Sequence, residues 1–397
     1  MIDLYSPDRY VNGAPYADFA RLRREQPVYW QPTPDGDGYW AITRHADVVE
    51  ISRDPETWSS ARGFVVIEPL SEAQLAMMRF TLLGMDPPEH ARYRRMLLGA
   101  FTPRMVAALE PRIREMAVAA LERMRERGKS EFVADLAGTL PMDVISELLG
   151  VPSPDRAELR RWADTLVHRE EGLFDVPRAA AEAFGKIWGY FAERIAERRK
   201  SPQEDLISAL LAAEIEGERL SQIDIQSFCN LMIVAGNETT TKLLANALYW
   251  LWRHPDQRKL VADDPRRIPR WVEETLRFDS STQAIGRVTT RALALHGVEI
   301  PAGKRVLVLI GSANRDERVF PRADAYDLER DTAAMLSFGH GAHFCLGAAL
   351  ARLEGRTVLE EFWKRFPDYE VEPAGCARVH SVSVRGFAAL PLELRGG

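Results

Sequence analysis

The sequence predicts a mainly helical fold with small β-sheets. Three observations predict it: an apolar period of 3.6 that persists from Ser221 to about Trp252, repeated helix start and stop signals elsewhere, and only a few short β-prone runs. No repeat, low-complexity tract or Gly/Ser linker divides the 397 residues, so we expect one large domain over 1–397. Its β-rich portion should lie near 28–67, 285–310 and 369–394, and the rest should be helical.

Local signals predict the helices that precede the long one. Asp86-Pro87-Pro88-Glu89 combines a capping residue, prolines in the first turn and an early acid, which predicts a helix to about Ala100. Thr102-Pro103 should open the next helix, which is interrupted at Pro111 and stops at Gly128. Further helices are expected at 143–149, from 153 onwards and at 177–199.

The pattern that starts at Ser221 covers roughly 31 residues, or about 47 Å of helix, so it must either cross the whole molecule or stand alone. Gly236 and Asn237 in its middle are weak helix formers, and Glu238 and three threonines follow them. A polar, poorly helical centre predicts a local opening of this helix. Later helices are expected at 269–278 and 346–366, and short strands at 39–42, 288–290, 306–310 and 379–384.

Composition and charge exclude several classes of protein. Hydrophobic residues make up 46% of the chain, and the net charge of −6 gives a field that repels nucleic acid. No apolar run approaches the roughly 18 residues of a membrane span, and the N-terminus has no signal-peptide h-region. Cys229, Cys345 and Cys376 are too few for a disulfide framework. We therefore expect a reduced, cytoplasmic protein in which a functional cysteine acts as a ligand or nucleophile.

The segment 338–347, Phe-Gly-His-Gly-Ala-His-Phe-Cys-Leu-Gly, carries the sharpest chemical signal. Glycines on both sides of His340 permit tight turns, and the next helix directs its positive dipole end at Cys345. Both effects favour a thiolate, which is the form that binds metals. The alternatives are an inert buried cysteine, a zinc site with His340 and His343 that lacks an evident fourth ligand, and a c-type haem, whose Cys-x-x-Cys-His motif is absent.

The same segment resembles the haem-ligand loop of the cytochrome P450 family, the haem-thiolate monooxygenases. The pattern Phe-Gly-x-Gly-x-His-x-Cys-x-Gly is filled at every position, and three further motifs follow in the family's order, so that the resemblance spans about Asp18 to Leu394. It implies a single-domain fold with a long central helix over a haem b group, and Cys345 as the axial ligand of the iron. It also implies haem contacts from Phe338, Gly339, His343 and Gly347.

A second motif is Glu273-Glu274-Thr275-Leu276-Arg277. Glu274 and Arg277 are i, i+3 on a predicted helix, so by themselves they could be an exposed pair worth a few tenths of a kcal/mol. In the family, such a Glu-x-x-Arg pair is buried behind the haem loop and joined by a later arginine. Arg330 matches that third member, and the resemblance implies a structural role for all three residues.

A third motif, Ala235-Gly236-Asn237-Glu238-Thr239, resembles the family's oxygen-activation segment. Ala235 and Thr239 are i, i+4, so they share the helix face that would look at the iron. The alternative is that threonines bond back to the helix and fill a kink. The resemblance makes Glu238 and Thr239 catalytic, as the acid and the alcohol that supply protons to bound dioxygen, and places Ala235 against the haem.

A fourth motif is His90-Ala91-Arg92-Tyr93-Arg94. His90 and Arg94 are i, i+4 and can grip one anion together, although a solvated basic helix face has the same pattern. In the family this pair binds the haem propionates, and His343 and Arg287 match two further propionate contacts. Two carboxylates that enter an apolar interior need such cations or donors.

The resemblance implies a monooxygenase that inserts one oxygen atom of O2 into an apolar small molecule, such as a terpene, steroid, fatty acid or macrolide-like compound. Electrons from NAD(P)H would arrive through a separate ferredoxin and ferredoxin reductase. By position, the substrate pocket should draw on Phe64, Val65, Val66, Leu231, Ala235, Ala284, Ile285 and Val382. The candidates for a basic patch that receives the ferredoxin are Arg92, Arg95, Arg352 and Arg356.

Two other functions are compatible with the Cys345 loop. One is a peroxide-driven or non-oxygenating haem-thiolate enzyme, and the other is a haem-binding sensor without turnover. An intact pair of Glu238 and Thr239 argues against both, because neither needs a proton relay.

Overall fold

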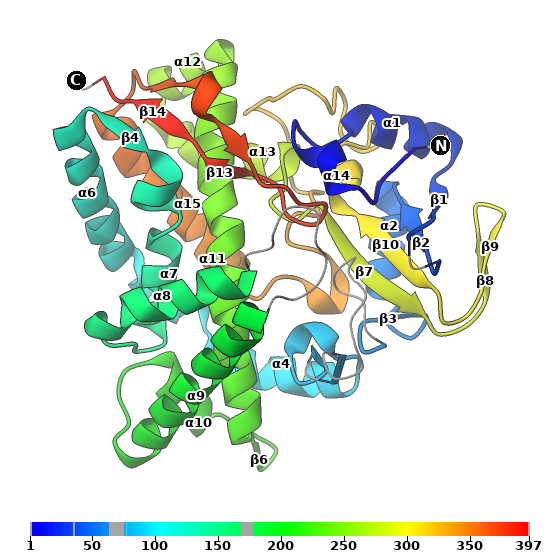
Figure 1. Ribbon diagram of the computed structural model, residues 1–397, viewed down its shortest axis with the longest axis horizontal. Helices are drawn as coiled ribbons and strands as arrows, with labels where there is room; N and C mark the ends of the chain where they lie inside the picture. The colour runs from blue at the N-terminus through cyan, green and yellow to red at the C-terminus, as the bar shows by residue number, and fades with distance from the viewer. Residues whose placement is uncertain (1, 35, 63–74, 77, 168–177, 396–397) are drawn as a thin grey trace.

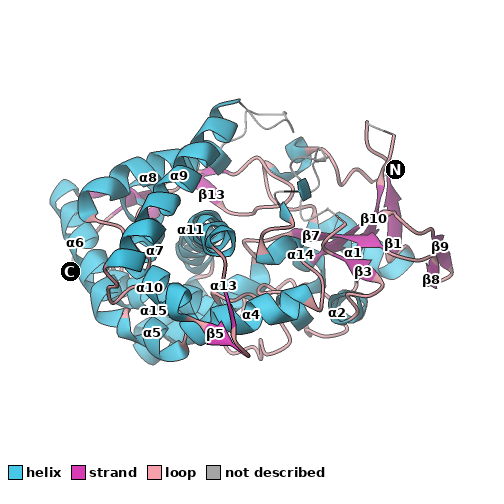
Figure 2. Cartoon of the chain, turned by 90° about the horizontal axis from the view of Figure 1, so that it is seen from below, coloured by secondary structure: helices cyan, strands magenta, loops and turns pink. Residues whose placement is uncertain are grey.

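The structure is a computed structural model that describes residues 2–34, 36–62, 75–76, 78–167 and 178–395. The long helix α11 (Gln222–Arg253) runs through the molecule, with most other helices on one side of it and the β-rich part on the other (Figure 1). Figure 2 shows α11 nearly along its axis, with other helices around it on the side that faces away from the main sheet. The fold is mainly helical with small sheets, as predicted.

Helix α11 begins and ends close to the predicted residues. Ser221 caps it, and Asp224 completes a capping box in which each side chain binds the other residue's backbone N–H. The predicted local opening is wrong, because the helix is continuous over all 32 residues. Gly236 serves close packing instead, since a Cβ there would come within 2.5 Å of Ile145 on the neighbouring helix.

The other predicted helices form with small shifts at their ends. Pro111 marks the break between two helices as expected, and Gly128 ends the second of them with φ of 68°. Asp86, however, does not cap the helix at Glu89; its carboxylate accepts hydrogen bonds from Ser59 Oγ and Ser60 N. The remaining helices are α1 (Tyr16–Glu25), α2 (His45–Arg53), α4 (Glu89–Ala100), α5 (Pro103–Ala108), α6 (Glu110–Arg127), α7 (Leu140–Leu148), α8 (Ser153–Val167), α9 (Arg178–Lys200), α10 (Leu206–Ala212), α12 (Pro255–Asp263), α13 (Ile268–Phe278), α14 (Ile310–Ala313) and α15 (Ala348–Arg365).

The main sheet has the order β1-β2-β10-β7-β3, in which only β2 and β10 are parallel. Its strands are β1 (Val28–Gln31), β2 (Tyr39–Ile42), β10 (Arg305–Leu309), β7 (Ala284–Thr289) and β3 (Trp58–Ser59). The smaller sheets pair β11 (Glu370–Val371), β14 (Pro391–Glu393) and β4 (Lys129–Glu131), β12 (Ala377–Arg378) with β13 (Phe387–Ala389), β5 (Glu214–Ile215) with β6 (Glu218–Arg219), and β8 (Leu293–Leu295) with β9 (Val298–Ile300).

The predicted strands at 39–42 and 306–310 are close to β2 and β10, and β7 starts earlier than expected, at Ala284. The strand predicted at 379–384 is wrong, because this segment connects β12 to β13. Ser381 Oγ accepts hydrogen bonds from the backbone N–H groups of Ser383 and Val384, which turns the chain there. Residues 379–384 are thus the long connection of the β12–β13 hairpin and not a strand.

The largest hydrophobic cluster lies between α11 and the helices packed on it, mainly α7, α9, α13 and α15, and extends to α6, which packs on α15. Two smaller clusters lie in the β-rich part on the two faces of the main sheet, and one of them includes the N-terminal residues Leu4 and Tyr10. In the described ranges, no helix combines the length and the apolar character that a membrane span requires.

Candidate active site

The loop that carries Cys345 turns sharply at two glycines before α15 begins. Gly339 and Gly341 have φ angles of 72° and 68°, in the region that favours glycine. A Cβ on Gly341 would also collide with the backbone oxygen of Ser52, at the end of α2. The Cys345 N–H donates to the oxygen of Phe338 at 2.8 Å, which closes the loop. The two glycines therefore fix the path of the backbone and the position of the sulfur.

The Cys345 side chain is accessible although protein surrounds it. It is exposed, yet burial raises the pKa of its thiol, while a backbone hydrogen bond from Gly347 and the charges of Arg94 and Arg352 lower it. A Cβ on Gly347 would touch only Cys345 Sγ, at 3.9 Å, so the space beside the sulfur is open. A flat group can lie against this turn and reach the sulfur.

Four basic side chains gather next to this loop from distant parts of the chain. His90 and Arg94 come from α4, His343 from the loop itself and Arg287 from β7. The rings of His90 and His343 have centroids 4.2 Å apart, and Arg94 donates to the oxygen of Phe344 at 2.6 Å. His343 also bonds Ser60 Oγ at 3.2 Å. Neither arginine forms an ion pair with any carboxylate in the described part of the chain.

Two members of this cluster, His90 and Arg287, are buried, and the other two, Arg94 and His343, are partly exposed. Burial lowers the pKa of Arg287 to about 10, and burial together with the charge of Arg94 lowers the pKa of His90 to about 4. Burial and the charge of Arg287 lower the pKa of His343 to about 2. His90 Nε2 is buried without a hydrogen-bond partner. Buried cations and orphaned donors need anions, so two carboxylates entering here fit the residues that are present.

The zinc alternative is not formed. Within the residues that the structure describes, no three His, Cys, Asp or Glu side chains come close enough together to hold a metal ion. His340 turns away from His343 and accepts a hydrogen bond from Arg53 Nε at 2.9 Å, whereas His343 packs on His90.

The predicted acid and alcohol lie on the middle of α11. The Thr239 hydroxyl donates to the oxygen of Ala235 at 2.9 Å, and Ala235 itself is exposed. The Glu238 carboxylate forms an ion pair with Lys242 Nζ at 3.0 Å. Lys242 was not among the predicted residues, although its i, i+4 spacing from Glu238 is visible in the sequence.

The structure brings Glu274, Arg277 and Arg330 together in the interior. Arg277 donates two hydrogen bonds to the Glu274 carboxylate, at 2.7 and 2.8 Å, and both side chains are at most 1% exposed. Arg330 lies 3.4 Å from the same carboxylate. Backbone oxygens of Asn314, Ala323 and Ala325 accept the other Arg277 donors. The three side chains thereby tie α13 to the segment that leads into the Cys345 loop.

The predicted pocket residues divide into three groups. Phe64, Val65 and Val66 lie outside the described residues. Ala284 and Val382 are at most 5% exposed in a cluster with N-terminal side chains, which leaves little of their surface for a substrate. Leu231 and Ile285 are partly exposed, and Ala235 is exposed.

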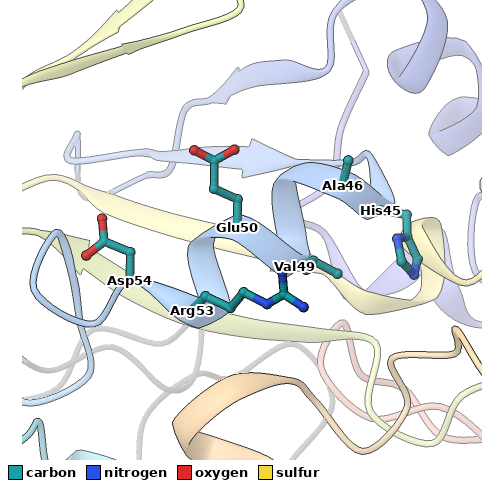
Figure 3. A pocket seen from close by; sticks show the side chains of 6 residues that line it. All are labelled: His45, Ala46, Val49, Glu50, Arg53 and Asp54. Carbon is teal, nitrogen blue, oxygen red and sulfur yellow. The ribbon is translucent and has the colours of Figure 1, made fainter.

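A separate surface hollow of about 540 Å³ lies along α2, outside the predicted site (Figure 3). It is lined by His45, Ala46, Val49, Glu50, Arg53 and Asp54. None of these is a predicted site residue, and Arg53 of the hollow donates a hydrogen bond to His340 of the Cys345 loop.

Ion pairs occupy three of the four arginines of the predicted basic patch. Arg352 binds Glu273 through two bonds of 2.7 and 3.0 Å, Arg356 binds Glu110 at 2.7 Å, and Arg92 binds Glu218. The Arg352 guanidinium also lies 4.4 Å from the ring centroid of Phe338, so it braces the Cys345 loop. Only Arg95 among the four pairs with no described carboxylate.

Comparisons with known proteins identify the family. The family model described as cytochrome P450 matches residues 173–264 and 268–375. Cytochrome P450 123 of Mycobacterium tuberculosis is 46% identical over 396 residues, which cover 100% of this chain and 97% of that protein. This chain belongs to the cytochrome P450 family.

Other P450s support the same assignment. The vitamin D(3) 25-hydroxylase of Pseudonocardia autotrophica is 39% identical over 400 residues, covering 99% of this chain and 96% of that protein. The structure of cytochrome P450 CYP109Q5 from Chondromyces apiculatus superposes with a TM-score of 0.90 at 38% identity, covering 100% of this chain and 98% of that one. The protein is a monooxygenase that uses haem b and O2, with electrons derived from NAD(P)H and delivered by partner proteins.

Proposed function

We propose that this P450 hydroxylates an apolar small molecule, with Cys345 as the haem-iron ligand. The observation that carries the proposal is the partly buried basic cluster of His90, Arg94, His343 and Arg287 beside an accessible thiol. A porphyrin with two propionates supplies ion-pair partners for Arg94 and Arg287, which have none in the described part of the chain, and a flat face for the open side of Gly347. When bound, the haem provides the iron centre at which O2 is activated.

The residues of this chain then have distinct tasks. Cys345 donates thiolate charge to the iron, and Phe338, Gly339 and Gly347 shape the loop around it. Thr239 and Glu238, on the turn of α11 that includes Ala235, hold and pass protons towards the reaction centre. The exposed Ala235 and the partly exposed Leu231 and Ile285 offer apolar contacts to a substrate. Vitamin D3, which one relative's name gives as its substrate, is of that chemical class.

We further propose a ferredoxin with its reductase as the redox partners. Of the four candidate arginines, Arg95 is the one that forms no ion pair with a described carboxylate, and we assign it to the docking surface for such a partner. A cytoplasmic location belongs to the same proposal, supported by three cysteines that are all free.

The experiment that tests the function starts with a screen of apolar compounds, including vitamin D3, for a ligand-induced spin-state shift of the haem. Compounds that give the shift are then incubated with NADH and a surrogate ferredoxin and reductase. The proposal expects a product that is heavier by one oxygen atom, labelled when 18O2 is used. The proposal would be contradicted if ligands shift the spin state and NADH is oxidised, but none of the ligands yields an oxygenated product.

Replacing Arg287 by leucine should weaken haem retention. A hydrogen bond to a charged group contributes about 1.5–3 kcal/mol, so we expect haem transfer to apomyoglobin to become about tenfold faster or more. The exposed Arg291, replaced by leucine, is the matched control and should leave the rate unchanged.

In the haem-free protein, Arg287→Leu should not reduce stability, because a buried guanidinium without an ion-pair partner opposes folding. Its free energy of unfolding should be equal to or higher than that of the haem-free wild type. A destabilised haem-free variant with normal haem retention would show that Arg287 is structural and does not bind a propionate.

Replacing Thr239 by alanine should uncouple electron use from product. The variant keeps the haem, since Thr239 Oγ1 bonds only within α11 to the oxygen of Ala235. Loss of a proton-donating group should lower product per NADH about tenfold or more, with hydrogen peroxide rising in its place. Thr239→Ser retains the hydroxyl and should restore coupling, whereas full coupling in Thr239→Ala would refute the assignment.

A further inference from the structure

Lys242 is a buried cation one turn beyond the proposed proton-delivering acid. Its residue is 5% exposed, and its ammonium has two partners: Glu238 Oε1 at 3.0 Å and the backbone oxygen of Phe387 at 3.1 Å. A buried ammonium is stable only when such partners compensate for its lost hydration. The two contacts therefore fix where the ammonium and the Glu238 carboxylate lie.

The second partner belongs to the β12–β13 hairpin, which is 145 residues away in the sequence. The hairpin backbone lies directly on the Lys242 stem, because a Cβ on Gly386 would come within 2.5 Å of Lys242 Cβ. Its connecting segment in turn binds the residues just before β7: Ser383 O accepts from Gln283 N, and Arg385 N donates to Ser281 O. Lys242 thus joins α11 to the chain segment that leads to Ile285.

A further carboxylate, that of Asp164, interacts with the ion pair of Glu238 and Lys242. Asp164 on α8 has an exposed surface, but the protein around it partly desolvates its carboxyl group. This burial and the charge of Glu238 raise the pKa of Asp164, and the charges of Arg160 and Lys242 lower it. The Asp164 carboxyl therefore interacts electrostatically with both the Glu238 carboxylate and the Lys242 ammonium. Without the Lys242 charge, the Glu238 carboxylate would lose its ion-pair partner at 3.0 Å and be free to adopt other rotamers.

We propose that Lys242 is a positioning residue, whose ammonium holds the Glu238 carboxylate in one orientation and ties it to the β12–β13 hairpin. The catalytic part of this inference rests on the proposed role of Glu238 in proton delivery. The tether to the hairpin does not depend on that role.

The test compares Lys242→Met, which keeps the length and removes the charge, with Lys259→Met. Lys259 is a matched control, because it also forms an i, i+4 ion pair on a helix, with Asp263, but on the surface. Hydrogen–deuterium exchange of haem-loaded protein is followed for the peptide that covers 377–389. We expect exchange at least about threefold faster in Lys242→Met and unchanged exchange in Lys259→Met. Unchanged exchange in Lys242→Met overturns the tether.

The second measurement is the share of NADH electrons released as hydrogen peroxide with a ligand from the spin-state screen. Glu238→Gln alone tests the proposed function and should raise this share. Lys242→Met should raise it about threefold, and the double variant should be no worse than Glu238→Gln, because Lys242 acts through Glu238. An effect of Lys242→Met that persists in the Glu238→Gln background, or no effect when Glu238→Gln has one, overturns the positioning role.

An unaltered peroxide share in Glu238→Gln contradicts the proposed function instead, and leaves the hairpin tether to be decided by the exchange measurement. If Lys242→Met does not accumulate as folded protein, Lys242→Gln replaces it, because its amide can still donate a hydrogen bond without carrying charge. Normal hairpin exchange and a normal peroxide share in Lys242→Gln would overturn the role of the charge.

Discussion

Replacing Cys345 by serine should abolish the strongly red-shifted Soret band that the reduced wild type gives with carbon monoxide. Serine keeps the shape of the side chain, but it removes the thiolate whose charge donation favours O–O cleavage. We expect monooxygenase activity to fall by about three orders of magnitude or more, the scale on which loss of a group bonded to the reacting centre acts. Difference spectra and product assays on the purified variant check both effects.

Cys376→Ser is the control for this variant. Cys376 is partly exposed at the edge of the main hydrophobic cluster, and its thiol donates a hydrogen bond to the oxygen of Glu372 at 3.5 Å. Its replacement should leave the spectrum and activity unchanged. A Cys345→Ser protein with a wild-type spectrum, or the same spectral loss in Cys376→Ser, would remove Cys345 from the iron.

Replacing Glu274 by alanine should cost about 3–5 kcal/mol of unfolding free energy, because it leaves buried guanidinium groups without their carboxylate. Arg277 and Arg330 both contact this carboxylate, and the backbone N–H of Asp327 donates to it at 2.9 Å. Since a loss of this size approaches the whole stability of many domains, little of the variant should accumulate with haem bound. Denaturant unfolding and haem content of the purified protein measure the effect.

The matched control is Glu329→Ala, in the same region. Glu329 forms an exposed ion pair with Arg267 at 2.9 Å, and such pairs contribute about 0–1 kcal/mol. Ordinary haem content and stability in Glu274→Ala, or an equal loss in Glu329→Ala, would show that the buried triad is not what holds this part of the molecule together.

Local signals were enough to predict the long helix and the Cys345 loop. The period of 3.6 and the Ser221 cap are properties of neighbouring residues, and so are the glycines at 339 and 341, whose positive φ angles require that residue type. The predicted opening of α11 failed because Gly236 was interpreted only by its weak helix propensity. Its contact with Ile145 depends on a helix about 90 residues away, which no local pattern reveals.

Long-range pairing accounts for the other differences. Strands of two or three residues, such as β3 and β12, are too short for an alternating pattern and exist only through their partners. The ion pair of Arg352 with Glu273 spans 79 residues, and it turned a candidate docking residue into a brace for Phe338. Lys242 was missed for a similar reason, because its second partner, Phe387, is known only from the fold.

The most direct test of the account is X-ray absorption at the iron edge of the purified wild type. If Cys345 is the axial ligand, the extended fine structure must contain one sulfur scatterer bound to iron together with the four porphyrin nitrogens. A first coordination shell made of nitrogen and oxygen only, in protein that has incorporated haem, would contradict it.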